Sequence, residues 1–330
     1  MRALHRQRPL LWLAGFTLVF LLALSIAPLI GGESLGLRAL LDRSSVEGFI
    51  LREQRLPRVF LGLLVGGGLA LAGACLQAVL RNPLAEPYTL GLSGGAAVGA
   101  ALVLTAPGLG ASLGGLAAVQ AAALLGAGAA LVFVYLVARR PMGIHTATVL
   151  LAGVTVSVLA SGVIMLVRIV VRPDEIAHVD RWMMGGLVVV GYRDVITALP
   201  LLTIGASLLM STMRELNQLA LGEELAGAQG VDVATVQRRV LLGAGLVTAA
   251  VVAAAGPIGF VGLLIPHAVR RLAGHDHRVL LPGAFLMGGA VLVICDTLAR
   301  TLVYPTEIPV GVITAVVGGP LFIMLLLRMR

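Results

Sequence analysis

The sequence predicts an all-α polytopic membrane protein that forms one transmembrane domain over residues 1–330. Of these residues 58% are hydrophobic and 12% are charged, and the mean hydropathy is +1.01. No water-soluble domain of this length needs so much apolar surface. The apolar residues also fall into runs of about 17–25, the length that a helix needs to cross a bilayer.

About ten such runs follow one another and predict the transmembrane helices: residues 10–30, 58–80, 90–106, 113–137, 146–170, 188–210, 240–255, 258–272, 279–301 and 309–327. The third, seventh and eighth are short, and Pro257 and Pro266 interrupt the eighth. Broken helices are tolerated at membrane depth only where protein or a cavity covers their backbone. The first run could imitate a signal peptide, but its length of about 20 residues favours an uncleaved helix.

An even number of spans places both termini on one side of the membrane, which we take to be the cytoplasm. The sequence contains no Lys, so all 24 basic residues are Arg. In this orientation 14 of them lie inside and 10 outside, in agreement with the positive-inside rule.

Small residues recur at close helical spacing in three spans, which lets helix backbones approach one another. They are Gly62, Gly66, Ala70 and Gly73, then Gly91, Gly95 and Gly99, and then Gly311, Ala315 and Gly319. A small-residue helix, a proline bend and a glycine-rich helix occur at 62–99 and, more loosely, at 243–270. We interpret this pattern as an inverted repeat.

Residues 211–239 form the longest polar interruption in the C-terminal half. Glu223 and Glu224 are placed as in the first turn of a helix, and Gly230 as its left-handed C-cap. Asp232 is placed as the N-cap of the next helix. A structured, charged element between two spans favours a docking surface for a soluble partner, and the alternative is a simple connector.

Three arginines lie at the outer ends of spans, where the positive-inside rule disfavours them. Arg55 and Arg58 flank a proline at the start of the second span, and Arg300 ends the ninth. They are consistent with a rim that meets an acidic partner. The alternative is local neutralisation, because Glu53 is close to Arg55 and Asp296 lies one turn before Arg300.

The loops offer fewer signals. Residues 81–87 and 139–146 connect spans on the cytoplasmic side and could form either the inner mouth of a pathway or simple turns. The first loop, residues 31–56, has apolar positions at helical spacing, which predicts a segment that lies along the outer surface.

Several functional classes are disfavoured. The arginines are scattered, which argues against nucleic-acid binding, and a chain without Lys cannot contain a Walker lysine motif. Cys75 and Cys295 lie inside apolar runs and are predicted to be core residues, not metal ligands. His267 is predicted to be accommodated by packing, and residues 275–277, His-Asp-His, to form a solvated loop. We therefore predict no catalytic residues and no metal site.

No acidic residue is centred in a span, since Glu86, Asp194 and Asp296 are all near ends. Ion-coupled carriers place ionisable groups near the midplane. If the protein moves a solute, the energy is expected to come from another chain. We expect that chain to act on this one through residues 211–239.

Two sets of motifs stand out along the chain. The N-terminal set is Arg-Leu-Pro-Arg at 55–58, Gln77, Asn-Pro-Leu-Ala-Glu-Pro at 82–87 and Leu-Gly-Leu-Ser-Gly-Gly-Ala at 90–96. The C-terminal set comprises 219–223 with Gly230, 259–267, 276–278 and 307–311. Together they resemble the FecCD-type permeases, the membrane subunits of importers for ferric siderophores, haem and cobalamin. The resemblance covers almost the whole chain and implies the type II ABC importer permease fold.

The resemblance also implies partners and site residues. Two copies would form a homodimer in a bacterial inner membrane, with two ATPase subunits below and a periplasmic binding protein above. The chain itself would bind no cofactor, and ATP would bind the partner. The residues that match the coupling helices are Leu221, Gly222, Glu223, Glu224, Ala226 and Gly230. Arg55, Arg58 and Arg300 match the docking arginines, and Asn82, Leu84, His145 and Thr146 match the inner gate.

The cargo expected from the resemblance is an iron chelate, siderophore or haem, because iron systems are the commoner members. Cobalamin is the alternative, although Ala147 after Thr146 departs from the Ser–Thr pair of cobalamin permeases. Arg168 and Arg172, in a charged segment at the outer end of the fifth span, are hypothesised to attract an anionic cargo. The rival classes are a stand-alone secondary carrier and a structural subunit without transport.

Overall fold

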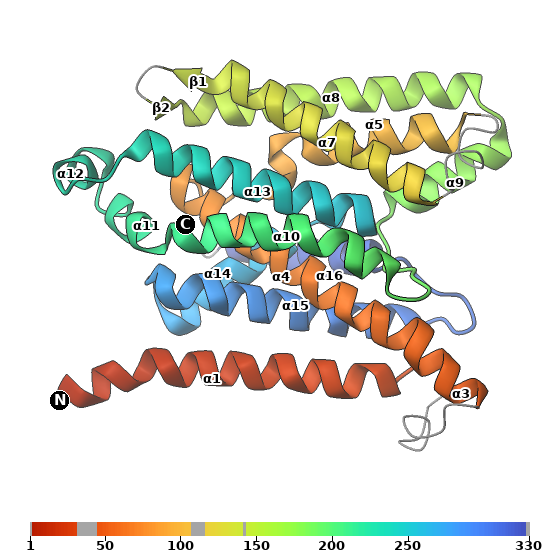
Figure 1. Cartoon of the computed structure of the whole chain (residues 1–330), viewed down its shortest axis with the longest axis horizontal. Helices are drawn as coiled ribbons and strands as arrows, with labels where there is room; N and C mark the ends of the chain where they lie inside the picture. Colours follow the sequence, from red (N-terminus) through yellow and green to blue (C-terminus); the bar gives the residue numbers. More distant parts are fainter. Residues whose placement is uncertain (1, 32–44, 107–115, 141–142, 328–330) are drawn as a thin grey trace.

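The computed structural model describes residues 2–31, 45–106, 116–140 and 143–327, and within them the chain is a bundle of long helices (Figure 1). The elements are α1 (Arg2–Ile26), η1 (Ala27–Leu29), α3 (Val46–Phe49), η2 (Ile50–Arg55), α4 (Leu56–Val79), η3 (Pro87–Leu90), α5 (Leu92–Leu104), α7 (Leu116–Ala138), β1 (Arg139–Arg140), β2 (Gly143–Ile144), α8 (Thr146–Val170), α9 (Pro173–Met183), α10 (Arg193–Ser211), α11 (Met213–Leu219), α12 (Glu223–Ala228), α13 (Val233–Ala255), α14 (Val261–Ala273), α15 (His277–Thr301) and α16 (Val310–Leu327). β1 and β2 pair as a short antiparallel hairpin.

Each of the ten predicted spans corresponds to one helix. Eight helical spans in the described residues are long and apolar enough to cross a membrane. The other two, α5 and α14, have 13 residues each, or about 20 Å, and stop short of a hydrocarbon core of about 30 Å. The seventh span is longer than predicted, because its helix begins at Val233 and reaches 23 residues.

Helix α4 lies at the centre of the bundle, and most of its side chains are buried. The predicted close approach of backbones is confirmed along it: a Cβ added at Gly66 would collide with Gly288 of α15, and one added at Gly73 would collide with Gly262 of α14. A Cβ added at Gly95 of α5 would likewise collide with the backbone of Gly126 of α7. Without a strong hydrophobic drive between helices in lipid, such close contacts supply the packing energy.

The interrupted pattern on which the repeat was predicted recurs in the helix lengths. α4 is followed by a bend and the short α5, and α13 is followed by the extended residues 256–260 and the short α14. Gly73 lies six residues before the end of α4, about 9 Å along the axis, and it contacts the start of α14. The two interrupted regions therefore meet inside the bundle, where protein covers their backbone.

α9 and the course of residues 46–55 were not predicted. α9 carries Pro173 at its first position and Arg181 in its last turn, and these are sequence signals for a helix. Residues 46–55 continue into α4 through α3 and the π-helical η2, instead of lying as a separate segment on the surface. The remainder of that predicted segment, 32–44, is outside the described residues.

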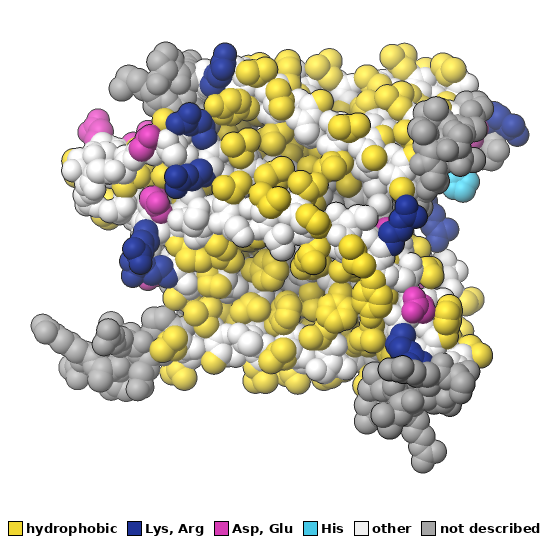
Figure 2. Space-filling model, in the orientation of Figure 1, with side chains coloured by type: hydrophobic (Ala, Val, Ile, Leu, Met, Phe, Trp, Pro, Cys, Tyr) yellow, Lys and Arg dark blue, Asp and Glu magenta, His cyan; other side chains and the backbone are white. Residues whose placement is uncertain are grey.

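The two ends of the bundle differ. The start of α1, the end of α16, α11, α12 and the β1–β2 hairpin lie at one end, and α3 and α9 lie at the other (Figure 1). Figure 2 shows an apolar band across the visible face, with arginines and acidic residues at both ends. Of the two cysteines, Cys75 is buried as predicted, and Cys295 is partly exposed.

Candidate functional site

The segment α11–α12 projects from the end of the bundle that also holds the start of α1 (Figure 1). Gly222 and Gly230 bound α12 and have φ angles of +123° and +87°, values that side chains with a Cβ rarely adopt. Glu223 and Glu224 are exposed in the first turn, as predicted. Leu221, just before α12, and Leu225 within it are both exposed, so this segment presents an apolar as well as an acidic surface to solvent. Ala226 is buried and faces the rest of the protein.

Hydrogen bonds hold this segment on the transmembrane helices. Asp232 caps α13 as predicted, accepting from Thr235 N at 3.0 Å and from its hydroxyl at 2.6 Å. These hydrogen bonds lower the pKa of Asp232. Arg81, after α4, donates to Leu219 O at 3.4 Å. α12 is therefore an exposed helix whose two flanking segments are held by hydrogen bonds.

The His-Asp-His segment is only partly the solvated loop that was predicted. His275 and Asp276 are exposed, whereas His277 is buried. Asn217 on α11 donates to Asp276 Oδ1 at 2.7 Å and accepts from His277 N at 2.9 Å. Desolvation raises the pKa of Asp276, but the hydrogen bonds from Arg278 N and Asn217 outweigh it and lower that pKa. The burial of His277 was not predicted because these bonds join residues about 60 positions apart in the chain.

At the opposite end, Arg58 is held by two carboxylates. Asp296 accepts from its Nε at 2.9 Å and from its Nη2 at 2.9 Å, and Glu307 accepts from Nη1 at 2.7 Å. The Asp296 side chain is only 2% exposed, whereas that of Glu307 is 46% exposed. Such fork-like pairing is the strongest that a guanidinium makes.

The other two predicted docking arginines are also buried. Arg300 lies 3.3 Å from Asp296 Oδ2, so the local neutralisation that was considered for this residue does occur. Arg55 donates to the carbonyl oxygens of Pro28 and Leu29 at 3.2 and 3.3 Å. All three arginines line one open cavity of about 510 Å³, together with Glu307 and Tyr304. The structure therefore brings the three residues together.

The predicted inner-gate residues lie on two separate segments. Asn82 accepts from Leu84 N at 2.9 Å and shapes the turn after α4, where Leu84 is exposed. His145 is the N-cap residue of α8, Thr146 begins that helix, and the His145 ring contacts the Thr148 hydroxyl at 3.0 Å. Within the described chain no hydrogen bond joins the first pair to the second.

Arg168 and Arg172 lie at the end of α8 that is opposite α12 (Figure 1). Arg168 forms an ion pair with Asp180 of α9, and Arg172 precedes α9 as its N-cap residue. Both are exposed. The charge of Arg168 is thus shared with a neighbouring carboxylate.

Polar side chains of α4 and of the segment after it reach the start of α14. Glu86 accepts from Phe260 N at 2.8 Å, and the Tyr88 hydroxyl accepts from Ile258 N at 2.7 Å. Gln77 Oε1 accepts from Arg270 Nη2 at 3.1 Å. Glu86 lies between α4 and α5, near a span end as predicted, and it satisfies one backbone N–H of the extended residues that precede α14. His267 Nε2, predicted to be accommodated by packing, has no hydrogen-bond partner in the described part of the chain.

Comparison with known proteins matches residues 15–328 to the model of the FecCD transport family. The chain belongs to this family. It is 47% identical to the cobalamin import permease of Halobacterium salinarum over 82% of this chain and 72% of the relative. It is 37% identical to the hemin transport permease of Yersinia pestis over 98% of each chain.

A solved structure supports the fold. It was assigned to the metal-chelate type of ABC transporter and has an inward-facing conformation. The TM-score is 0.84 and the identity 31%, over 97% of this chain and 99% of that one. The chain is thus a permease subunit of an ABC importer, a multi-pass membrane protein and not an enzyme. Such a subunit works with an ATPase and a binding protein.

Proposed function

We propose that the chain passes an iron chelate, a siderophore or haem, across a bacterial inner membrane as part of a homodimeric importer. Two ATPase subunits would supply the energy and bind the ATP, a periplasmic binding protein would deliver the cargo, and this chain would bind no cofactor. The support for the cargo is a group of relatives named for hemin and for ferric dicitrate, of which the second is 38% identical.

The observation that carries the energy coupling is the exposure of α12. Its acidic first turn and the exposed Leu221 stand clear of the bundle, at the same end as the start of α1 and the end of α16. We place this end in the cytoplasm, where the ATPase binds. Closure of the ATPase pair would push on α12 and alternate the opening of the path.

The path would run between two copies of the chain. α8 and α16 support this proposal, because both expose long apolar faces, among them Leu151, Val158 and Val316. Asn82, Leu84, His145 and Thr146 would form the inner gate, and Arg168 and Arg172 would attract an anionic cargo at the outer end. The cavity with Arg55, Arg58 and Arg300 would receive acidic residues of the binding protein.

Cobalamin is the second candidate cargo. It is favoured by the 47% identical relative, which is named a cobalamin import permease. Uptake by cells that carry only this importer separates the two: iron-chelate uptake supports the first cargo, and cobalamin uptake supports the second.

The proposed assembly is tested by affinity purification in mild detergent, followed by mass spectrometry of the copurifying chains. We expect an ATPase in equal amount to this chain. Absence of the ATPase from a complex shown to survive the detergent would contradict the proposal and restore the secondary-carrier hypothesis.

The coupling role is tested by Glu223→Arg with Glu224→Arg. We expect ATP hydrolysis to lose its dependence on transport, because the charges that face the ATPase are reversed. Glu47→Arg is the matched control, since Glu47 is exposed at the other end of the bundle. Unchanged coupling in the double variant would contradict this role of α12.

A further inference from the structure

A hollow of about 220 Å³ lies between α7, α10 and α13. α7 and α10 both pack on α13, and the side chains that should fill the space between them are small. The wall contains Ala117, Ala121, Ala198, Ala250, Ala253 and Ala254. Because close packing is the norm inside proteins, a hollow walled by alanines leaves room for a slender apolar group.

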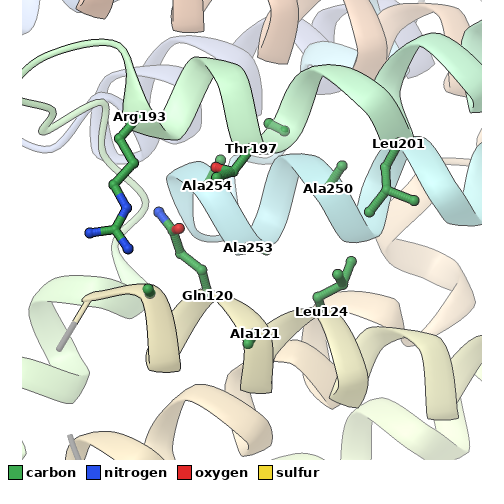
Figure 3. A pocket seen from close by; sticks show the side chains of 11 residues that line it. Gln120, Ala121, Leu124, Arg193, Thr197, Leu201, Ala250, Ala253 and Ala254 are labelled. Atoms are coloured by element: carbon green, nitrogen blue, oxygen red, sulfur yellow. The ribbon is translucent and has the colours of Figure 1, made fainter. Parts of the chain in front are cut away.

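One end of the hollow is polar. Figure 3 shows the guanidinium of Arg193 and the amide of Gln120 facing the same space, with Leu124 and Leu201 further along the wall. Gln120 Nε2 donates to the buried Asp194 at 2.8 Å, which ties α7 to α10. Arg193 is exposed, and within the described chain it forms no hydrogen bond or ion pair.

A second hollow of about 270 Å³ adjoins the first and shares Gln120, Ala253 and Ala254. It adds Arg181 and Trp182 from α9. Arg181 is also exposed and unpaired among the described residues. Two arginines therefore flank Gln120, with the carboxylate of Asp194 buried beneath it.

The polar end lies at the edge of the apolar band. α10 begins at Arg193, and the residues that follow on its outward face, such as Ile196 and Leu199, are exposed and apolar. The visible face of the bundle has the same order, charged at its ends and apolar between them (Figure 2). Arginines at this level meet lipid phosphates.

We propose that this hollow binds an anionic phospholipid from the leaflet opposite α12. Its phosphate is held by Arg193, which presents the fork of donors that suits phosphate, and one acyl chain lies along the alanine wall. A free anion would use only the polar end, whereas most of the wall is apolar. The lipid fills the space between α7 and α10 and holds their outer ends together alongside the Gln120–Asp194 hydrogen bond.

The test is native mass spectrometry of the purified chain with dioleoyl phosphatidylglycerol or dioleoyl phosphatidylcholine added. We expect wild-type protein to prefer phosphatidylglycerol and Arg193→Gln to bind it about tenfold more weakly, which corresponds to about 1.4 kcal/mol. Arg193→Lys should retain part of the preference. Arg52→Gln is the matched control, because it removes one charge from the same end away from the hollow.

A second pair of variants tests the acyl groove. Ala121→Leu fills the hollow from its exposed side and should reduce binding of both lipids, whereas Ala129→Leu fills a separate apolar hollow and should not reduce the phosphatidylglycerol preference. Three results would each overturn the proposal: no preference in the wild type, equal effects of Arg193→Gln and Arg52→Gln, or glycerol phosphate binding that Ala121→Leu leaves unchanged. The last of these would indicate a free-anion site.

Discussion

Two charged clusters at opposite ends of the bundle are built in opposite ways. In the cluster around Arg58, the residues Arg55, Arg300 and Asp296 are buried, Arg58 is only 11% exposed, and the four are bonded to one another or to backbone carbonyls. At the other end, Glu223 and Glu224 are exposed on a short helix that stands away from the bundle. The charges around Arg58 form contacts inside the fold, whereas those of Glu223 and Glu224 face solvent.

This difference separates stability from docking. Removal of one member of a buried ion pair leaves the other charge buried and unpaired, which is costly. An exposed charge on a helix contributes little to the free energy of folding. We therefore expect substitutions in the cluster around Arg58 to change stability and binding together. Substitutions of the exposed carboxylates of α12 should change binding alone.

The largest effect is expected from Asp296→Ala. It leaves Arg58 and Arg300 buried without their shared carboxylate, so the free energy of unfolding should fall by about 3–5 kcal/mol. Unfolding in mixed micelles measures it. The control is Glu223→Ala at the exposed end, which should stay within about 0.5 kcal/mol of wild type. Equal stabilities for the two variants would remove the contrast between the ends.

A smaller effect is expected at the boundary of α12. Gly230→Ala forces a Cβ into a positive φ and should destabilise the local fold by about 1 kcal/mol. Gly227 lies inside α12, and a Cβ added there would meet no other atom. Because Gly loses more conformational entropy than Ala on forming a helix, Gly227→Ala should stabilise the helix by about 0.5–1 kcal/mol. Hydrogen exchange of the 220–232 amides measures both, and the same sign for both variants would contradict the helix boundary.

Glu307→Gln tests the arginine cluster from its exposed side. Glu307 also pairs with Arg58, but its solvent exposure limits the change in the free energy of unfolding to about 1 kcal/mol or less. The same micelle unfolding measures it. A loss as large as that of Asp296→Ala would show that burial does not distinguish the two carboxylates.

The smallest effect is expected from pH at Asp232. Its pKa is lowered in the folded chain, so its stabilisation of α13 is fully present above the unfolded pKa of about 3.9 and is lost as the pH falls through the lower folded value. The stability difference between wild type and Asp232→Ala should be constant from pH 7 to about pH 4 and then shrink. A difference that does not depend on pH below that point would contradict the capping role.

Local signals predicted much of the fold. The spans could be located because each needs its own apolar run, and the ends of α12 could be placed because Gly230 and Asp232 act within a few residues of themselves. α9 has comparable local signals in Pro173 and Arg181, so it too was predictable from the sequence.

The sequence by itself determined the ten spans, the projecting acidic element and the family. Only the tertiary structure decided that Arg58 shares Asp296 with Arg300, although Arg58 and Asp296 are 238 positions apart in the chain, and that Glu86 accepts from Phe260 N just before α14. It also decided that Arg193 and Gln120 share one hollow. Helix ends and apolar runs depend on neighbours in the chain, whereas these pairs depend on which helices pack together, and a single sequence carries no separate signal for that.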